Sequence, residues 1–301
     1  MSNTRKGIIL ALLTVGLWST LGVGLKLAVS RVGGFTAVVW IIGVSAVALF
    51  VYLIAVGKAG RIWPALRGQP VFFIGTGLAG FGLHQVLYLH GYQLLPASQV
   101  IIIHYLWPLT MVVLAVLVYR ERTTRISLLF VATGFIGLYI ALAKGTLLQL
   151  DLSAGVVITF TGSFFWALFS VLIKHRDFDI DVGMFLFNLF GLLFLIAMIP
   201  AFEFTLDVTA KEIVGFAYLG VFPTAISYIL WNHALRLART SLCSNIVLLM
   251  PVLSLIWIRL ILAEEITVYQ LTGFALILGS VFLNLRYGGV EGVGAVREPP
   301  L

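Results

Sequence analysis

Long apolar segments separated by short polar loops dominate the chain. Each segment is close to the ~20 apolar residues that a helix needs to cross a bilayer. The segments cover approximately residues 7–28, 36–57, 70–93, 97–119, 126–144, 154–174, 182–202, 211–235, 241–262 and 268–286. This pattern predicts an all-α polytopic membrane protein with ten transmembrane helices.

Composition and charge agree with that prediction. Of 301 residues, 61% are hydrophobic and 10% are charged, whereas soluble domains carry about 25% charged residues. Most of the 19 Lys and Arg residues fall on one side of the predicted membrane, and the loops of the other side hold only Lys26, Arg31, Lys144 and Lys211. The positive-inside rule therefore predicts a multi-pass protein of the bacterial inner (plasma) membrane with both termini cytoplasmic. Because topology explains the basic charge, no nucleic-acid partner is expected.

The two halves of the chain resemble each other. Residues 77–121 align on residues 220–264 without a gap, and a second constant offset aligns the starts of the halves. Matched pairs include Trp18 with Trp166, His90 with His233, Pro108 with Pro251, and Glu121 with Glu264. Each half has five segments, and since five is odd the second half must enter from the opposite side. We predict two inverted five-helix repeats, 5–145 and 153–287, and a cytoplasmic tail, 288–301. Inverted repeats are typical of transporters, which bind substrate near the midplane.

Short motifs carry a family resemblance. "GLWST" at Gly16–Thr20, "HYLWP" at His104–Pro108, and a proline-to-glutamate segment ending each fourth span resemble the drug/metabolite transporter superfamily, EamA type. Within it, the first two motifs look most like the YddG-type exporters of aromatic amino acids. The resemblance implies export of amino acids or related metabolites through a central cavity lined by both repeats.

Aromatic and hydrogen-bonding side chains recur at mid-membrane depth in both halves. Polar groups there are costly and usually face the bundle interior or a watery cavity, although hydrogen bonds that join helices and plain core packing are alternatives. The predicted substrate-binding residues are Trp18, His84, Tyr88, His104, Trp107, Trp166, Tyr228, Trp231, Ser244 and Asn245. Such a neutral, aromatic set suits a zwitterion with an apolar side chain, that is, an amino acid-like substrate.

Two prolines lie in register in the fourth span of each repeat. Pro108 and Pro251 each remove a backbone hydrogen bond and kink a helix, and Pro108 frees the carbonyl of His104. The pair is either a hinge for alternating access or two static kinks that shape the bundle.

Glycines at helical spacing indicate close helix approach. Gly75, Gly77 and Gly80 formally match a dinucleotide fingerprint, but they lie inside an apolar helix without the expected acidic residue downstream, so no cofactor is expected. Another set in the fifth and tenth segments packs either within the protomer or between protomers, so monomer and homodimer both stay open. This set is Gly134, Gly137, Gly273 and Gly279.

No carboxylate lies at the predicted midplane, which disfavours antiport through a membrane-embedded glutamate. Export is uncoupled, or it is proton-coupled through His84 or His104. Drug or other metabolite export is the alternative. A nucleotide-sugar or sugar-phosphate carrier would need several cations in the cavity, and Lys26, Lys174 and Arg259 sit toward span ends. The chain lacks membrane aspartates, a Ser nucleophile motif and paired metal-binding histidines, so no enzyme and no metal site is predicted.

Overall fold

The computed structural model describes residues 2–21, 23–24, 32–95, 100, 103–121, 123–143, 153–262 and 267–287. All regular secondary structure in these ranges is helical. The first half contains α1 (Asn3–Ser19), α3 (Gly34–Ala55), η1 (Ala59–Arg61), α4 (Ile62–Gly68), α5 (Pro70–Gly77), η2 (Leu78–Leu83), α6 (His84–Leu94), α8 (Trp107–Tyr119) and α9 (Arg125–Ala143).

The second half follows the same order. Its elements are α10 (Ala154–Lys174), α11 (Ile180–Met198), η3 (Ile199–Ala201), α12 (Ala210–Leu219), η4 (Gly220–Ile226), α13 (Ser227–Leu237), α14 (Thr240–Val247), α15 (Leu249–Leu262) and α16 (Val268–Tyr287). Each predicted apolar segment contains described helix. Six stretches are both long and apolar enough to cross a membrane, and three shorter apolar helices accompany them. The described part of the chain is thus all-helical, with several membrane-spanning helices.

Two helices contain a π-helical turn at equivalent places in the halves. The segment η2 joins α5 to α6, and η4 joins α12 to α13. In η4, Pro223 has no N–H to donate, and the Thr224 hydroxyl instead donates to the carbonyl of Leu219 at 2.8 Å. π turns insert an extra residue into a helix and are frequent at functional sites. The residues that directly follow them, His84 and Ser227, are therefore candidates for a functional site.

Capping side chains fix the starts of two helices in the second half. Asp179 accepts hydrogen bonds from the first backbone N–H groups of α11, and Thr209 with Glu212 forms a capping box at the start of α12. These side chains satisfy N–H groups that have no partner inside the helix. Polar loop residues therefore fix where two apolar helices of the second half begin.

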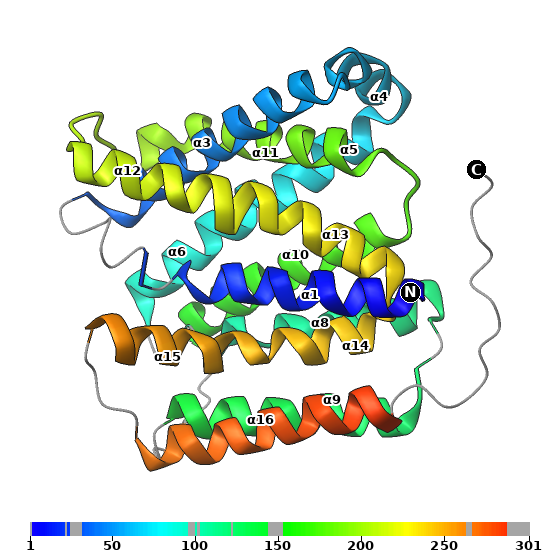
Figure 1. Cartoon of the computed structure of the whole chain (residues 1–301). Coiled ribbons are helices and arrows are strands. Elements are labelled where there is room, and N and C mark those ends of the chain that lie inside the picture. Colours follow the sequence, from blue (N-terminus) through cyan, green and yellow to red (C-terminus); the bar gives the residue numbers. More distant parts are fainter. Residues whose placement is uncertain are drawn as a thin grey trace.

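The helices form one bundle in which the two halves interleave. Figure 1 shows α9 and α16 paired at one edge, α3 and α11 at the opposite edge, and α1 and α10 between them. Helix α1 packs on α13, α14 and α15, whereas α10 packs on α6 and α8. The first helix of each half therefore contacts the other half, and the core lies around this crossing.

Glycines mark the closest helix approaches. A Cβ on Gly77 would lie 2.9 Å from the carbonyl oxygen of Phe187, and one on Gly80 would lie 2.5 Å from the ring of Phe169. The predicted close approach is confirmed at these two positions, while Gly75 faces open space. Likewise Gly137 approaches the carbonyl of Gly273, so this pair packs α9 on α16 within one protomer.

Candidate functional site

A connected group of aromatic rings occupies the core. Trp18 of α1 lies at its centre, with ring centroids 6.4 Å from Trp107, 6.3 Å from Trp166, 5.6 Å from Tyr228 and 5.4 Å from Trp231. These residues come from α1, α8, α10 and α13, so both halves contribute. Edge-to-face geometry, as in most of these pairs, is the favourable arrangement of aromatic rings.

Two histidines extend this group. His84 Nε2 and His104 Nε2 are 2.9 Å apart and share one hydrogen bond. The His84 ring lies 5.1 Å from that of Trp166, and the Tyr88 ring lies 4.2 Å from that of His104. The hydrogen bond joins the third segment to the fourth, so the helix-joining role considered for His84 is present in this structure.

Eight of the ten predicted binding residues therefore lie in one set of ring contacts. Phe81 and Phe169 complete it, since Phe81 packs on Trp166 and Tyr228, and Phe169 stacks on Trp166. We call these ten residues the ring cluster: Trp18, Phe81, His84, Tyr88, His104, Trp107, Trp166, Phe169, Tyr228 and Trp231. In this structure the rings contact one another directly, and all but Tyr88 and His104 are buried.

Ser244 and Asn245 carry no ring and so are not part of the ring contacts. Both are fully buried on α14, which packs against α1 and α8. Among the described residues, the Ser244 hydroxyl and both amide atoms of Asn245 have no hydrogen-bond partner. Buried polar groups without partners are uncommon and require an explanation.

Unpartnered polar atoms also occur within the ring cluster. Within the described part of the chain, the indole nitrogens of Trp18 and Trp231 are buried without a hydrogen-bond partner. Leaving such a group unpaired costs ~1–3 kcal/mol. Two N–H donors surrounded by aromatic faces offer both polar and apolar contacts to a small molecule.

The fourth segment of each half is interrupted just before its proline. The chain leaves the helix at Tyr105–Leu106, and α8 then begins with Pro108 in its first turn. In the second half, Leu248 separates α14 from α15, near whose start Pro251 lies. The expected kink at Pro108 is thus a break three residues upstream. The carbonyl of His104 is free of the helix and accepts a 2.9 Å hydrogen bond from Ser163 of α10.

The motif residues after Trp18 link α1 to two other helices. Ser19 Oγ accepts a hydrogen bond from Trp257 Nε1 of α15 at 2.9 Å, and Thr20 Oγ1 accepts one from the Tyr218 hydroxyl of α12 at 2.8 Å. These bonds hold α1 between α12 and α15 at the end of the bundle opposite the N-terminus.

A buried ion pair joins the halves at the N-terminal end of the bundle. Lys174 Nζ lies 3.0 Å from Glu121 Oε1 and also donates to Thr240 Oγ1 at 2.8 Å. Glu121 accepts from the Thr240 N–H at 2.8 Å and from its hydroxyl at 2.6 Å. We call Glu121, Lys174 and Thr240 the Glu121 network. Burial raises the pKa of the Glu121 carboxyl, but Lys174 and the Thr240 hydrogen bonds outweigh burial and lower it.

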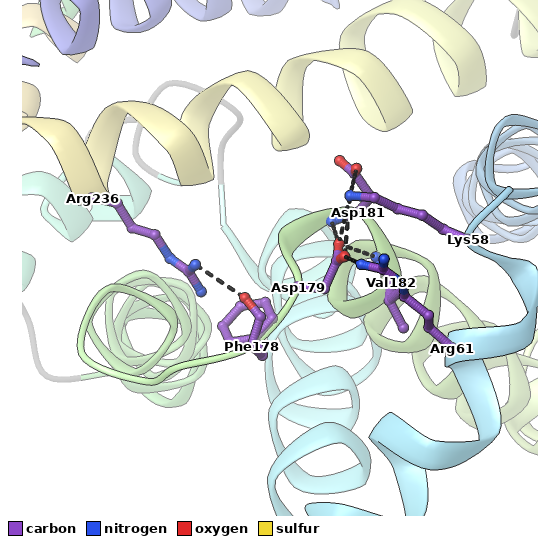
Figure 2. A network of polar contacts seen from close by, with 7 residues as sticks. All are labelled: Lys58, Arg61, Phe178, Asp179, Asp181, Val182 and Arg236. Atoms are coloured by element: carbon purple, nitrogen blue, oxygen red, sulfur yellow. Dashed lines mark hydrogen bonds and ion pairs between the residues drawn. The ribbon is translucent and has the colours of Figure 1, made fainter. Parts of the chain in front are cut away.

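A second polar network lies at the same end and is drawn in Figure 2. Lys58 Nζ, from the loop after α3, lies 3.0 Å from Asp179 and 2.5 Å from Asp181, while Arg61 lies 3.2 Å from Asp179. These hydrogen bonds, led by that of Asp181, raise the pKa of Lys58. In the same view, Arg236 donates to the carbonyl of Phe178 at 3.0 Å. Both networks connect the first half of the chain to the second.

The several long apolar helices define the class as a multi-pass membrane protein. The chain belongs to the EamA-like transporter family, whose model matches residues 5–143 and 153–286. Members of this family move small metabolites across membranes.

Several relatives carry transporter names. The chain is 25% identical to the uncharacterized transporter YyaM of Bacillus subtilis, over 92% of this chain and 91% of the relative. It is 28% identical to a probable terminal-alkyne amino-acid exporter of Streptantibioticus cattleyicolor, over 77% and 79% of the two chains. A solved crystal structure described without a function superposes with a TM-score of 0.83 at 19% identity, over 95% of this chain and 99% of its own, and shows the fold alone.

Sequence reasoning missed parts of the site. Phe81 and Phe169 carry no polar group, so nothing distinguishes them from the other phenylalanines of apolar segments. Ser163 was missed because its partner is a carbonyl that only the helix break exposes. Glu121 is matched by Glu264 in the repeat, but that match does not indicate Lys174 as its partner.

Proposed function

We propose that this protein exports amino acids, aromatic and other neutral ones, from the bacterial cytoplasm by alternating access. Its ten spans form two inverted five-helix repeats in the inner membrane, with both termini cytoplasmic. Two features support the internal repeat. The π-helical turns Leu78–Leu83 and Gly220–Ile226 fall in register in the sequence alignment of the halves, and so do the breaks before Pro108 and Pro251.

The observation that carries the substrate proposal is the ring cluster with its unpartnered N–H groups. An amino acid presents a carboxylate, an ammonium group and an apolar side chain. The Trp18 and Trp231 indole N–H groups can donate to the carboxylate, and the aromatic faces can hold the ammonium group by cation–π contact, which contributes about 0.5–2 kcal/mol. None of the ten residues of the ring cluster is a lysine, arginine or carboxylate, so a neutral zwitterion fits it better than a sugar phosphate.

Two polar networks that join the halves support alternating access. The Glu121 network and the Lys58–Asp179–Asp181 network tie the halves together at the cytoplasmic end. A substrate reaches the ring cluster from the cytoplasm when these networks separate. The helix breaks before Pro108 and Pro251 are the hinges of this motion, because freed backbone groups there can exchange partners without unfolding a helix.

A substrate panel in liposomes tests the proposal. Purified protein is reconstituted into vesicles preloaded with one unlabelled solute, and uptake of the labelled solute by counterflow is followed. The panel contains phenylalanine, tryptophan, methionine, threonine, a sugar phosphate and a cationic dye. We expect neutral amino acids to exchange faster than in protein-free vesicles. Exchange of only the sugar phosphate or the dye would refute the substrate class.

The same vesicles distinguish uncoupled from proton-coupled export. An imposed pH gradient drives net amino acid movement if His84 or His104 carries a proton with the substrate. We expect no such drive, because the histidines share one hydrogen bond and lack a carboxylate partner in the ring cluster. Net flux along the pH gradient would instead support coupling through these histidines.

A further inference from the structure

A groove beside the Glu121 network combines free cationic side chains with an apolar wall. Its volume is about 460 Å³, and it lies where α8, α9 and α14 meet. We call it the arginine groove, and its lining residues are Val116, Arg120, Glu121, Thr123, Thr124, Leu128 and Arg239. The proposed transport assigns no role to its two arginines.

The charges of the groove are unbalanced. Among the described residues, Arg120 and Arg239 make no ion pair, whereas the Glu121 carboxylate is already held by Lys174 and Thr240. Two guanidinium groups therefore face the groove without a counter-charge. Guanidinium groups bind phosphate oxygens through paired N–H donors.

Helix α9 adds a third feature that favours an anion. It begins at Arg125 beside the groove, and its first turn holds no acidic side chain to offset the positive end of the helix dipole. The Thr124 hydroxyl accepts the N–H of Ser127 and so caps the start of this helix. A helix N-terminus next to two arginines favours a negatively charged ligand.

Arg120 lines this groove from a backbone conformation that is unfavourable for residues other than glycine. Arg120 has φ 52° and ψ 36°, the left-handed region, and is the non-glycine residue with positive φ in the described part of the chain. Glycine is the residue that normally takes this place after a helix. The turn also places the next residue, Glu121, against Lys174, so the groove and the Glu121 network share one piece of backbone.

The apolar wall indicates the source of the anion. Val116 and Leu128 are exposed, and they belong to the apolar helices α8 and α9. On the orientation proposed above, the groove lies at the cytoplasmic membrane surface, where acyl chains meet headgroups. We propose that it binds one anionic phospholipid, with the phosphate on Arg120 and Arg239 and an acyl chain along Val116 and Leu128. A free phosphate ion has no apolar part that could pack against Val116 and Leu128.

The bound lipid would stabilise the closed cytoplasmic end. Arg239 directly precedes Thr240, and Arg120 directly precedes Glu121. A phosphate that bridges the two arginines therefore holds α8 and α14 together at the point where the Glu121 network joins them. Anionic lipid is thus expected to bind the closed state more tightly than a state in which these helices separate.

Lipid binding to the purified protein tests this proposal. Native mass spectrometry measures binding of phosphatidylglycerol and of phosphatidylcholine to the wild type, to R120Q/R239Q, and to the control K6Q/R67Q. The control removes two exposed cytoplasmic cations outside the groove. We expect R120Q/R239Q to bind phosphatidylglycerol about 30-fold more weakly, from the membrane attraction of two basic side chains. The control and phosphatidylcholine binding should change little.

Three results would overturn the proposal. The first is equal loss of phosphatidylglycerol binding in both double variants, which reports general surface charge. The second is wild-type binding by R120Q/R239Q. The third is competition by inorganic phosphate at the lipid's concentration, which indicates a free-anion site. The variant R120G keeps the turn, because glycine favours positive φ, and so separates loss of the guanidinium from misfolding. Lipid binding is measured without substrate, so its failure leaves the export proposal intact.

Discussion

Replacing Glu121 with glutamine removes the carboxylate that ties α8 to α10 and α14. In the structure this carboxylate contacts Lys174 at 3.0 Å and accepts two hydrogen bonds from Thr240. The Glu121 and Lys174 side chains are only 13% and 12% exposed, so the pair is largely shielded from water. The substitution leaves the Lys174 ammonium group without its counter-charge, and α8, α10 and α14 should therefore separate more often at this end of the bundle.

The size of the effect follows from burial and from what glutamine retains. Breaking a fully buried ion pair by removing one partner costs ~3–5 kcal/mol. Glutamine keeps an oxygen that can accept the N–H of Thr240, and the network is slightly exposed, so we expect about 2 kcal/mol, below that range. A shift of this size increases the open population about 30-fold.

The chain's one cysteine reports opening directly. Cys243 is fully buried on α14, one helical turn after Thr240. Because a maleimide reagent reaches the thiol only when α14 separates from its neighbours, its labelling rate at fixed pH measures the open population. We expect Glu121→Gln to label about 30-fold faster than the wild type.

The matched control is Glu203→Gln, which neutralises an exposed glutamate in a loop of the second half. It should label at the wild-type rate. Equal rates for Glu121→Gln and the wild type would refute the view that the Glu121 network holds the cytoplasmic end closed.

Acidification should act in the same direction as Glu121→Gln. The pKa of Glu121 is lowered in the folded protein from a usual value of 4.5, and that of Asp179 from 3.8. A lowered carboxyl pKa stabilises the fold above the unfolded-state value and loses that contribution as pH falls through the folded-state value. We expect the wild-type thermal midpoint to fall below about pH 4.5 more steeply than that of Glu121→Gln; parallel curves would contradict this assignment.

Two further substitutions test the packing around the ring cluster. Gly80→Ala places a methyl group against the Phe169 ring and should destabilise the protein by ~1–3 kcal/mol, while Gly75→Ala in the same motif faces open space and should not; equal thermal midpoints would show that the two helices are not in close contact. Ser163→Ala leaves the buried carbonyl of His104 without its donor and should cost ~1–3 kcal/mol. Ser163→Thr should restore most of that stability, and a lack of rescue would argue against the hydrogen bond.

Hydropathy predicted most helix positions because the bilayer imposes a simple rule. A span must be apolar for ~20 residues, and the segment predicted at 154–174 coincides with α10, Ala154–Lys174. The internal repeat drew attention to Trp18 and Trp166, which the structure places 6.3 Å apart at the ring centroids. Residues with a distinctive chemistry in a uniform apolar background were therefore identifiable from the sequence.

Other features depend on tertiary geometry that hydropathy does not encode. The π turn before His84 raises no hydropathy signal, because it changes only the hydrogen-bond pattern of a continuous apolar helix. Pro108 was expected to kink a helix, yet the chain breaks upstream, and the proline instead occupies the first turn of α8, where its missing N–H costs nothing. Asn245 is polar and close to Pro251, and among the described residues both of its amide atoms are buried without a hydrogen-bond partner, which its position in the sequence does not predict.

Counterflow of labelled phenylalanine in liposomes tests the central claim most directly, because it asks whether the ring cluster is the substrate site. Trp18→Ala removes the ring at the centre of the cluster, and Trp63→Ala removes an exposed tryptophan of α4 that lies outside it. Both proteins must first show the wild-type elution profile after purification. We predict that Trp63→Ala exchanges phenylalanine at the wild-type rate and that Trp18→Ala loses at least ten-fold, equivalent to about 1.4 kcal/mol of binding. Equal exchange by the two variants would contradict the account.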